Sequence, residues 1–467
     1  MNERRGRTGE VSTPAAGRAA PVLRTFLGIL CLMMMGPPLL PAAETRSIAF
    51  HEAVAIALER NSALARAENA AALDRNAVSQ ARSRFLPDLG LGLSGTESRT
   101  RSFDESSGVT ESGTSRSFHA GLSSSVVLFD GLANVSNVKA TRLAERAGLL
   151  DIERTRQTVV FDVITGYLVM IEATEQARVQ KENLAAQEKQ EEFIRRLVDW
   201  GERPVSDLYQ QQASVAAGRF SLVEAERALD LSRVDLVQTL RLDPAGEYSF
   251  EIPPLPPAGG GRPEPGLKEL LERAFAERPD LKAQEARLEA AEQDARVAAA
   301  GRWPALSLSA DYGTRSGTPS DVAFSDQLDR NRSGSVGLSL SLPLFDRFET
   351  RRAIERARIN REDTDLALSD SRQEAALQVR RAILDRDAAV ERLEAAEARA
   401  LASEKALEFT EQRYAAGAAT LYEVVLSRAE FVAASSAGVS ARYTLLWQER
   451  LLDYYVGDLD PSGTLAP

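Results

Sequence analysis

The sequence predicts a mainly α-helical protein with transmembrane β-strands, built as a duplicated repeat of long helical hairpins plus four β-strands per chain. Three observations carry this prediction. The composition is typical of long helices, with 27% charged and only 6% aromatic residues in 467. Several short motifs recur at one constant spacing, which indicates an internal repeat. Four short segments alternate apolar and small polar residues, and period two is the mark of β-strands.

Residues 1–43 are predicted to be a secretory signal peptide. Five arginines precede the apolar run TFLGILCLMMMG. That run is too short to span a bilayer, so a retained anchor is the less favoured alternative. The only cysteine, Cys31, lies in this run. Cleavage of the predicted signal peptide would leave a mature chain without thiols, which fits a periplasmic or outer-membrane location. The full chain has a net charge of −11, so nucleic acid is not an expected partner.

The rest of the chain consists of two copies of one plan. Four landmarks of the first copy return 216 or 217 residues later, namely Pro87 at Pro304, Leu128-Phe129-Asp130 at Leu344-Phe345-Asp346, Gly201 at Gly417, and Ala213 at Ala429. We therefore expect a first repeat over residues 44–249 and a second over 267–457. Residues 250–266, FEIPPLPPAGGGRPEPG, are too rich in Pro and Gly for helix and form the expected linker, and residues 458–467 form a C-terminal tail.

Each copy is expected to contain a helix, a pair of strands and a very long helical stretch that is broken once. The first helices are predicted over His51–Arg84 and Leu267–Arg302. The stretch from Leu132 to Trp200 would form a rod on the order of 100 Å, too long for the core of a compact domain. The Gly-containing segments WGERPVSDL and AGAATLYEV interrupt the two rods, which predicts two long antiparallel helical hairpins.

The alternating segments admit two interpretations. Their Leu-rich face covers a helix, or it faces lipid while the Gly/Ser face lines water. The runs are roughly 8 to 11 residues long, which is the length of a tilted membrane strand. Aromatic residues cluster at one end of all four strands, as in an interfacial girdle, and these are Phe85, Phe129, Trp303 and Phe345. The membrane interpretation is favoured, with Arg99–Ser117 and Arg315–Gly334 as long exposed loops. No later segment is apolar for 18 residues, so no transmembrane helix is expected.

Four strands are too few for a closed barrel, since the smallest known transmembrane barrels have about eight. An open edge in lipid would leave backbone groups unpaired. The chain is therefore expected to oligomerise, and three copies with twelve strands are the natural solution.

With these features together, the sequence resembles the TolC-like outer-membrane efflux family over Glu44 to Gly457. The segment RYAAGAATLYEVVLSRA is the most specific local match, and LPLFD before a long helix is another. The resemblance implies a homotrimer with a 12-stranded outer-membrane β-barrel and a periplasmic α-helical tunnel. It also implies a passive exit duct for efflux or type I secretion, served by a periplasmic adaptor protein and an inner-membrane pump. The substrate and the pump class are not predictable from the sequence.

The resemblance also implies a set of residues at the inner tip of the two hairpins. The gate residues carried over from the family are Ser206, Asp207, Tyr414, Glu423 and Arg442. The adaptor-docking turns carry Gly201, Pro204, Gly417 and Thr420. Asp207 and Arg442 are expected to pair and hold the tip shut, whereas without the resemblance they would be ordinary solvated helix charges. Ala419 stands where the family's best-known member has a second gate arginine, and Leu426 where it has a second acidic ring.

No other chemistry is indicated. The two histidines, His51 and His119, have no Cys or His neighbours at metal-ligand spacing. No phosphate-binding loop or nucleophile motif stands out, so no enzyme activity, cofactor or metal is expected. The competing hypothesis is a periplasmic coiled-coil adaptor or scaffold without a membrane barrel.

Overall fold

The computed structural model describes residues 46–106, 108–253, 266–318 and 320–459. The predicted signal peptide, most of the predicted linker and most of the tail lie outside these residues.

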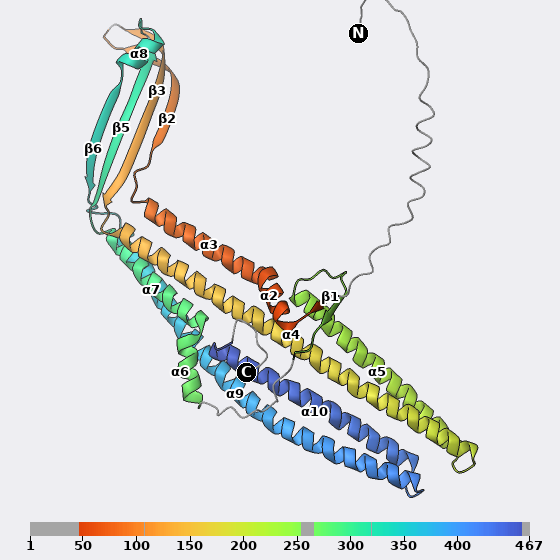
Figure 1. The fold of residues 1–467 in the computed structure, drawn as a ribbon. Helices are drawn as coiled ribbons and strands as arrows, with labels where there is room; N and C mark the ends of the chain where they lie inside the picture. Colours follow the sequence, from red (N-terminus) through yellow and green to blue (C-terminus); the bar gives the residue numbers. More distant parts are fainter. Residues whose placement is uncertain (1–45, 107, 254–265, 319, 460–467) are drawn as a thin grey trace, which may run out of the picture. The chain divides into compact units, whose positions relative to one another are not determined.

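The first copy comprises α2 (Phe50–Arg60), α3 (Ser62–Ser83), β2 (Gly90–Asp104), β3 (Val109–Phe129), α4 (Ala133–Asp199) and α5 (Val205–Thr239) (Figure 1). The second comprises α6 (Leu267–Glu277), α7 (Pro279–Ala300), β5 (Ala305–Thr318), α8 (Phe324–Arg330), β6 (Ser333–Ser341), α9 (Glu349–Ala415) and α10 (Leu421–Val456).

The duplication is visible in the two long helices. α4 and α9 are each 67 residues long, and they begin at equivalent positions 216 residues apart. α5 returns along α4 and α10 returns along α9, so both predicted helical hairpins are confirmed. A residue with a left-handed backbone precedes each long helix. It is Leu132 before α4, with φ of 70°, and Phe348 before α9, with φ of 65°.

The repeated Leu-Phe-Asp motif builds the junction between strand and long helix. Oδ2 of Asp130 accepts a hydrogen bond from the backbone N of Asn134 at 2.9 Å, and Oδ2 of Asp346 accepts one from Thr350 N at 2.8 Å. The carboxylate thus satisfies a free N–H at the positive end of each helix. Because this bond needs a sharp reversal after the strand, the junction has two consecutive left-handed residues in both copies.

The first helix of each copy is broken, where the sequence predicted one continuous helix. In the first copy the break falls at Asn61, whose side chain accepts hydrogen bonds from the N–H groups of Ala63 and Leu64 and so caps α3. In the second copy it falls at Arg278, and Pro279 then occupies the first turn of α7. Both break residues have an extended backbone with ψ near 120°.

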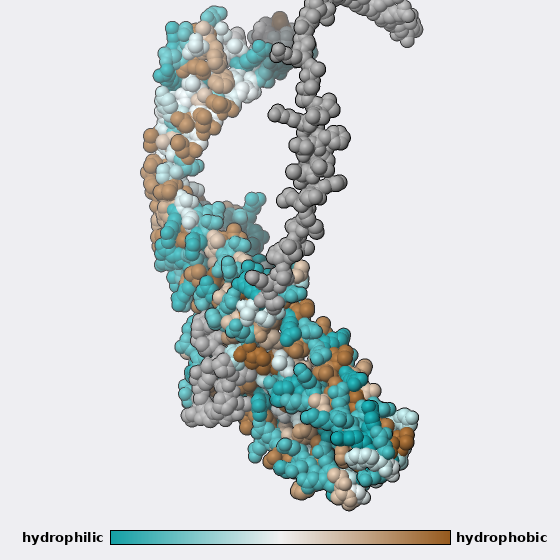
Figure 2. Space-filling view, turned by 45° about the vertical axis from the view of Figure 1, so that its right-hand side comes forward, coloured by the Kyte–Doolittle hydropathy of each residue, from teal (hydrophilic) through white to brown (hydrophobic). Residues whose placement is uncertain are grey.

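The four long strands form one antiparallel sheet in the order β2-β3-β5-β6. Residues directly opposite each other share a face, which places the leucines on one face and Gly and Ser on the other. The apolar face carries Leu91, Leu93, Leu122, Val126, Leu308, Tyr312, Val336, Leu338 and Leu340. Among the described residues most of these side chains are exposed, with Leu338 at 66%, whereas Val126 and Leu308 are half-buried. Figure 2 shows apolar side chains gathered along these strands.

Two expectations about the sheet were wrong. β2 and β3 have 15 and 21 residues, so most of the expected loop Arg99–Ser117 is strand. The expected loop Arg315–Gly334 begins as strand and contains the helix α8. Beyond the apolar band both faces of these strands are polar apart from Phe103 and Val109, so the alternation that marks a strand in the sequence is weak there.

Two short strands were not expected. β1 (Arg46–Ile48) pairs with β4 (Tyr248–Phe250), and the backbone N of Glu251 donates to Ile48 O at 3.0 Å. Phe250 therefore belongs to a strand and not to the linker.

The helical core is centred on α4. Tyr167 is fully buried, with its ring 5.0 Å from that of Phe50 in an edge-on contact and its hydroxyl donating to Ile48 O at 3.4 Å. An 18-residue window of α4 is apolar enough to cross a membrane by length and composition, but 44% of it is buried by the chain.

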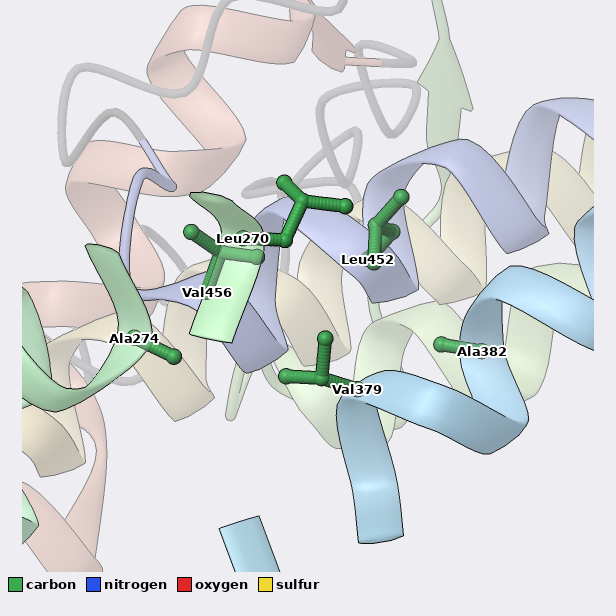
Figure 3. Close-up of a cluster of buried hydrophobic side chains, with 6 residues drawn as sticks. All are labelled: Leu270, Ala274, Val379, Ala382, Leu452 and Val456. Carbon is green, nitrogen blue, oxygen red and sulfur yellow. The ribbon is translucent and has the colours of Figure 1, made fainter. Parts of the chain in front are cut away.

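A second cluster ties the helices of the second copy together. Leu270 and Ala274 of α6 pack against Val379 and Ala382 of α9 and against α10, whose contribution is Leu452 and Val456 (Figure 3). Each of these residues lies one or two turns from the next on its own helix, which is the spacing of a packed helical face.

Candidate functional site: the tips of the two hairpins

The two hairpin turns have the same backbone geometry. Gly201 and Gly417 both have φ of 75°, and a Cβ at either position would meet no atom within 4 Å. Glycine is needed at these positions for the left-handed backbone and not for lack of space. In both turns the glycine N–H donates to the carbonyl three residues earlier, of Val198 and Tyr414 respectively, at 3.0 Å.

The next helix starts differently in the two turns. Pro204 precedes α5, whereas Thr420 caps α10 and accepts a hydrogen bond from the backbone N of Glu423 at 3.3 Å. Thr420 and Glu423 have the spacing of a capping box. Glu423 also lies 3.4 Å from the guanidinium of Arg413, which in turn donates to Ala418 O. Through Thr420 and Arg413, Glu423 thus stabilises the turn between α9 and α10.

An apolar cluster joins the two tips. Ile194 of α4 packs with Tyr414 of α9, with Ala419 of the second turn and with Leu421 and Val424 of α10. Ala419 is only 8% exposed, so a larger side chain at this position would have to displace this packing. The tips of the two hairpins are therefore packed against each other inside one chain.

Tyr414 carries the polar contacts of this cluster. Its side chain is 1% exposed, and its hydroxyl donates to Oδ2 of Asp207 at 3.4 Å. Burial raises the pKa of Tyr414, and the negative charge of Asp207 raises it further. Tyr414 is thus a neutral donor at physiological pH, and its bond joins α9 to the first turn of α5.

Arg203 was not predicted from the sequence. Its Nη2 donates to the carbonyl oxygen of Tyr414 at 2.8 Å, and its guanidinium carbon lies 4.4 Å from the centre of the Tyr414 ring. The second contact is a cation–π interaction. The only sequence signal for Arg203 is its place in a turn just before a proline, and that does not reveal which way the side chain points.

The expected pair of Asp207 and Arg442 is not formed within the chain. Arg442 lies well inside α10, where its Nη2 donates to Glu397 of α9 at 3.2 Å. Both partners are more than half exposed, so this is an ordinary surface pair. Ser206, also expected at the gate, is an exposed residue of the first turn of α5.

The four expected interfacial aromatics are exposed at the ends of the strands that adjoin the helices. Phe85 is 47% and Trp303 62% exposed, and Phe129 and Phe345 are 39% and 72% exposed. Among the described residues no group of three or more His, Cys, Asp or Glu side chains is arranged to hold a metal ion.

Comparison with known proteins supplies the identity. The family described as "Outer membrane efflux protein" matches residues 53–240 and 270–458, which are the two copies of the repeat. The chain belongs to this outer-membrane efflux protein family. The match covers both hairpins and all four long strands, so it rests on the whole architecture.

Individual relatives agree with this family. The chain is 25% identical to the outer membrane protein TolC of Escherichia coli over 412 residues, which cover 85% of this chain and 80% of TolC. It is 26% identical to the pyoverdine export outer membrane protein OpmQ of Pseudomonas aeruginosa, over 78% of this chain and 75% of OpmQ. The fold is that of the outer membrane protein VceC of Vibrio cholerae, with a TM-score of 0.74, 20% identity, and coverage of 87% of this chain and 96% of VceC.

Membership of this family gives the function in general terms. The chain is an outer-membrane channel protein of the efflux and secretion type, and its relatives are channels and not enzymes. The competing hypothesis of a periplasmic adaptor without a membrane barrel is not supported.

Proposed function

We propose that three copies of the chain form a passive exit duct, with one shared 12-stranded barrel in the outer membrane and a helical tunnel in the periplasm. The observation that carries the proposal is the four-stranded sheet with a largely exposed apolar face, in which the edge strands β2 and β6 have no second partner among the described strands. In lipid, unpaired backbone groups at such edges are costly, so β6 of one copy must pair with β2 of the next.

The width of the lumen argues against two copies, and the family resemblance gives three. Two copies would close eight strands, and a barrel of eight has an interior that side chains nearly fill. Twelve strands leave a wider lumen, and the opposite face of this sheet is lined by Gly and Ser, which suits a water-filled pore.

The hairpin tips form the periplasmic entrance of the proposed duct. A periplasmic adaptor docks on the turns that carry Gly201, Pro204, Gly417 and Thr420, and an inner-membrane pump supplies the energy. The contacts of Tyr414 with Asp207 and Arg203 hold each tip in its closed position, and three copies of Glu423 lie around the entrance. The supporting fact is that these contacts tie one hairpin to the other.

Recording from planar bilayers tests the proposal. The purified mature chain, reconstituted as an oligomer, is expected to give discrete single-channel currents, small because the tips are closed. A protein that remains in the soluble periplasmic fraction and inserts into no bilayer would contradict the proposal.

A further inference from the structure

The apolar face of the sheet has the height of a membrane. On β3 it extends from Phe129 to Phe118, which is roughly 35 Å along the strand. At the tilt of barrel strands this gives a band roughly 25–30 Å tall, close to that of outer-membrane barrels. The residues that follow Phe118 on this face thus lie at the level of the lipid headgroups.

The same face becomes basic immediately beyond Phe118. Arg116 follows on β3, and Glu97, its partner opposite on β2, is followed on the same face by Arg99 and Arg101. Nε of Arg116 and Nη2 of Arg99 each lie 2.9 Å from an oxygen of Glu97. Arg101 forms no hydrogen bond or ion pair with the side chains that the structure describes. We name Arg99, Arg101 and Arg116 the rim arginines.

The rim arginines keep an unbalanced positive charge that points outward. Among the described side chains of β2 and β3 on this face beyond Phe118, three guanidinium groups face one carboxylate. The side chains of Arg99 and Arg116 are 82% and 72% exposed. An exposed charge pair of this kind stabilises a protein little, so stability does not explain why the charges are placed here.

The neighbouring strand is covered at this level. The ring of Phe324 in α8 lies 5.5 Å from that of Phe118, and Gln327 accepts hydrogen bonds from Ser316 Oγ and Gly317 N of β5. α8 therefore covers the apolar-side face of β5 and reaches β3 at Phe118. The side chains of Arg99 and Arg116, farther along β2 and β3, stay 82% and 72% exposed.

The chain connections show which leaflet the rim arginines meet. β2 begins and β3 ends next to α3 and α4, and the rim arginines lie toward the other end of these strands. In an outer-membrane channel with a periplasmic helical part, that other end faces the cell exterior. The headgroups there belong to the outer leaflet, whose lipids carry phosphate groups.

We propose that the rim arginines bind the phosphate groups of outer-leaflet lipid, while the acyl chains of the same lipid lie on Leu91, Leu93 and Leu122. Guanidinium groups suit phosphate because they present several donors in a planar fork. The proposal rests on the membrane position of the strands and goes beyond the proposed duct, since a pore needs no specific lipid.

Lipid titration of the purified oligomer in detergent tests this. The added probes are lipid A, chemically dephosphorylated lipid A and inorganic phosphate, and the readout is the temperature at which the oligomer dissociates on a gel. The variants are the triple substitution R99S/R101S/R116S, the single substitution Arg101→Ser, and Arg315→Ser as control. Arg315 lies at the same end of the sheet on the opposite face, where it pairs in register with His119.

Lipid A should raise the dissociation temperature of the wild type and of Arg315→Ser, and dephosphorylated lipid A should not. The triple variant should need roughly tenfold or more lipid A for the same effect, and Arg101→Ser an intermediate amount. An equal response to dephosphorylated lipid, or an unchanged response of the triple variant, would overturn the proposal. A full response to inorganic phosphate alone would show an anion site and not a lipid site.

Channel recording of the same variants separates this proposal from the proposed duct. The triple variant and Arg101→Ser should insert and conduct as the wild type does, because their substituted residues lie neither at the hairpin tips nor on the pore-lining face of the sheet. If the wild type itself fails to conduct, the duct is refuted, whereas loss of the lipid A response with conductance intact supports the lipid site.

Discussion

At the scale of single residues, Tyr414 shows how a buried aromatic side chain can join two hairpins. Its ring packs in the apolar cluster with Ile194, while its hydroxyl and its carbonyl reach Asp207 and Arg203. The resemblance named Tyr414 and Asp207 correctly as neighbours. It missed Arg203. Within the chain Arg442, which lies far along α10, pairs with Glu397 and not with Asp207.

Substitutions at this contact should open the channel. Arg203→Ala removes a hydrogen bond and a partly exposed cation–π contact, together about 1–2 kcal/mol per chain. Tyr414→Phe removes only the hydroxyl bond and keeps the packing. Both should increase single-channel conductance in planar bilayers, since they weaken the closed tip relative to the open one.

Arg442→Ala is the matched control for these variants. It removes a positive charge from the hairpin that carries Tyr414, but the partner of Arg442 is the exposed Glu397 and not Asp207. We expect an unchanged conductance. A rise in Arg442→Ala that equals the rise in Arg203→Ala would contradict the assignment of the tip contact.

At the scale of elements, the sequence predicted the type and order of the helices and strands well where the hydrophobic periodicity was strong. The rods of α4 and α9 follow from a long stretch without proline, and the turns follow from Gly201 and Gly417. The break at Arg278 was missed although Pro279 signals it, since a proline disfavours a helical backbone at the residue before it. The helix α8 was not predictable, since seven residues of helix leave almost no periodic signal.

The break at Arg278 is held by a polar network. Arg278 is 4% exposed, and its Nη2 lies 2.7 Å from Oδ2 of Asp280, whose other oxygen lies 3.8 Å from Nε of Arg154 on α4. Burial by itself raises the pKa of Asp280, but the hydrogen bonds and charge of Arg278, together with the charge of Arg154, outweigh it. The pKa of Asp280 is therefore lowered from its usual value.

This lowered pKa predicts a pH-dependent effect of Asp280→Asn. The carboxylate stabilises the fold above the unfolded pKa of about 3.9, and the stabilisation is lost as the pH falls through the lower folded pKa. At neutral pH the variant should lose about 1–2 kcal/mol, a figure discounted because the carboxylate is partly exposed. Thermal melting followed by the helical circular dichroism signal measures the difference in unfolding free energy between variant and wild type. A difference that persists unchanged below pH 3 would contradict the prediction.

The two faces of β6 offer a second test at this scale. Leu338→Arg places a charge on the lipid-facing side at a cost of about 2–4 kcal/mol near the membrane centre, whereas Ser339→Arg places the same charge on the opposite face. The first variant should be depleted from the outer-membrane fraction and the second should assemble normally. Equal assembly of both would mean that this face of the sheet does not meet lipid.

At the scale of the whole molecule, the sheet is incomplete in a single chain. β2 and β6 each have one partner strand among the described strands, and the apolar band continues to both edges. The sequence showed the shortage of strands, and the resemblance gave the number of copies. Neither the sequence nor the resemblance predicts the register between β6 of one copy and β2 of the next, because that register depends on how two chains pack together.

Disulfide cross-linking between the edges tests the closed trimer most directly. The predicted mature chain contains no cysteine, since Cys31 lies in the predicted signal peptide. One cysteine is placed at Ser333 of β6 and a second is moved along residues 90–96 of β2, one position at a time. We predict that some positions give covalent dimers and trimers on a non-reducing gel, and nothing larger. Covalent dimers as the largest product, or a ladder beyond three chains, would contradict a barrel closed by three copies.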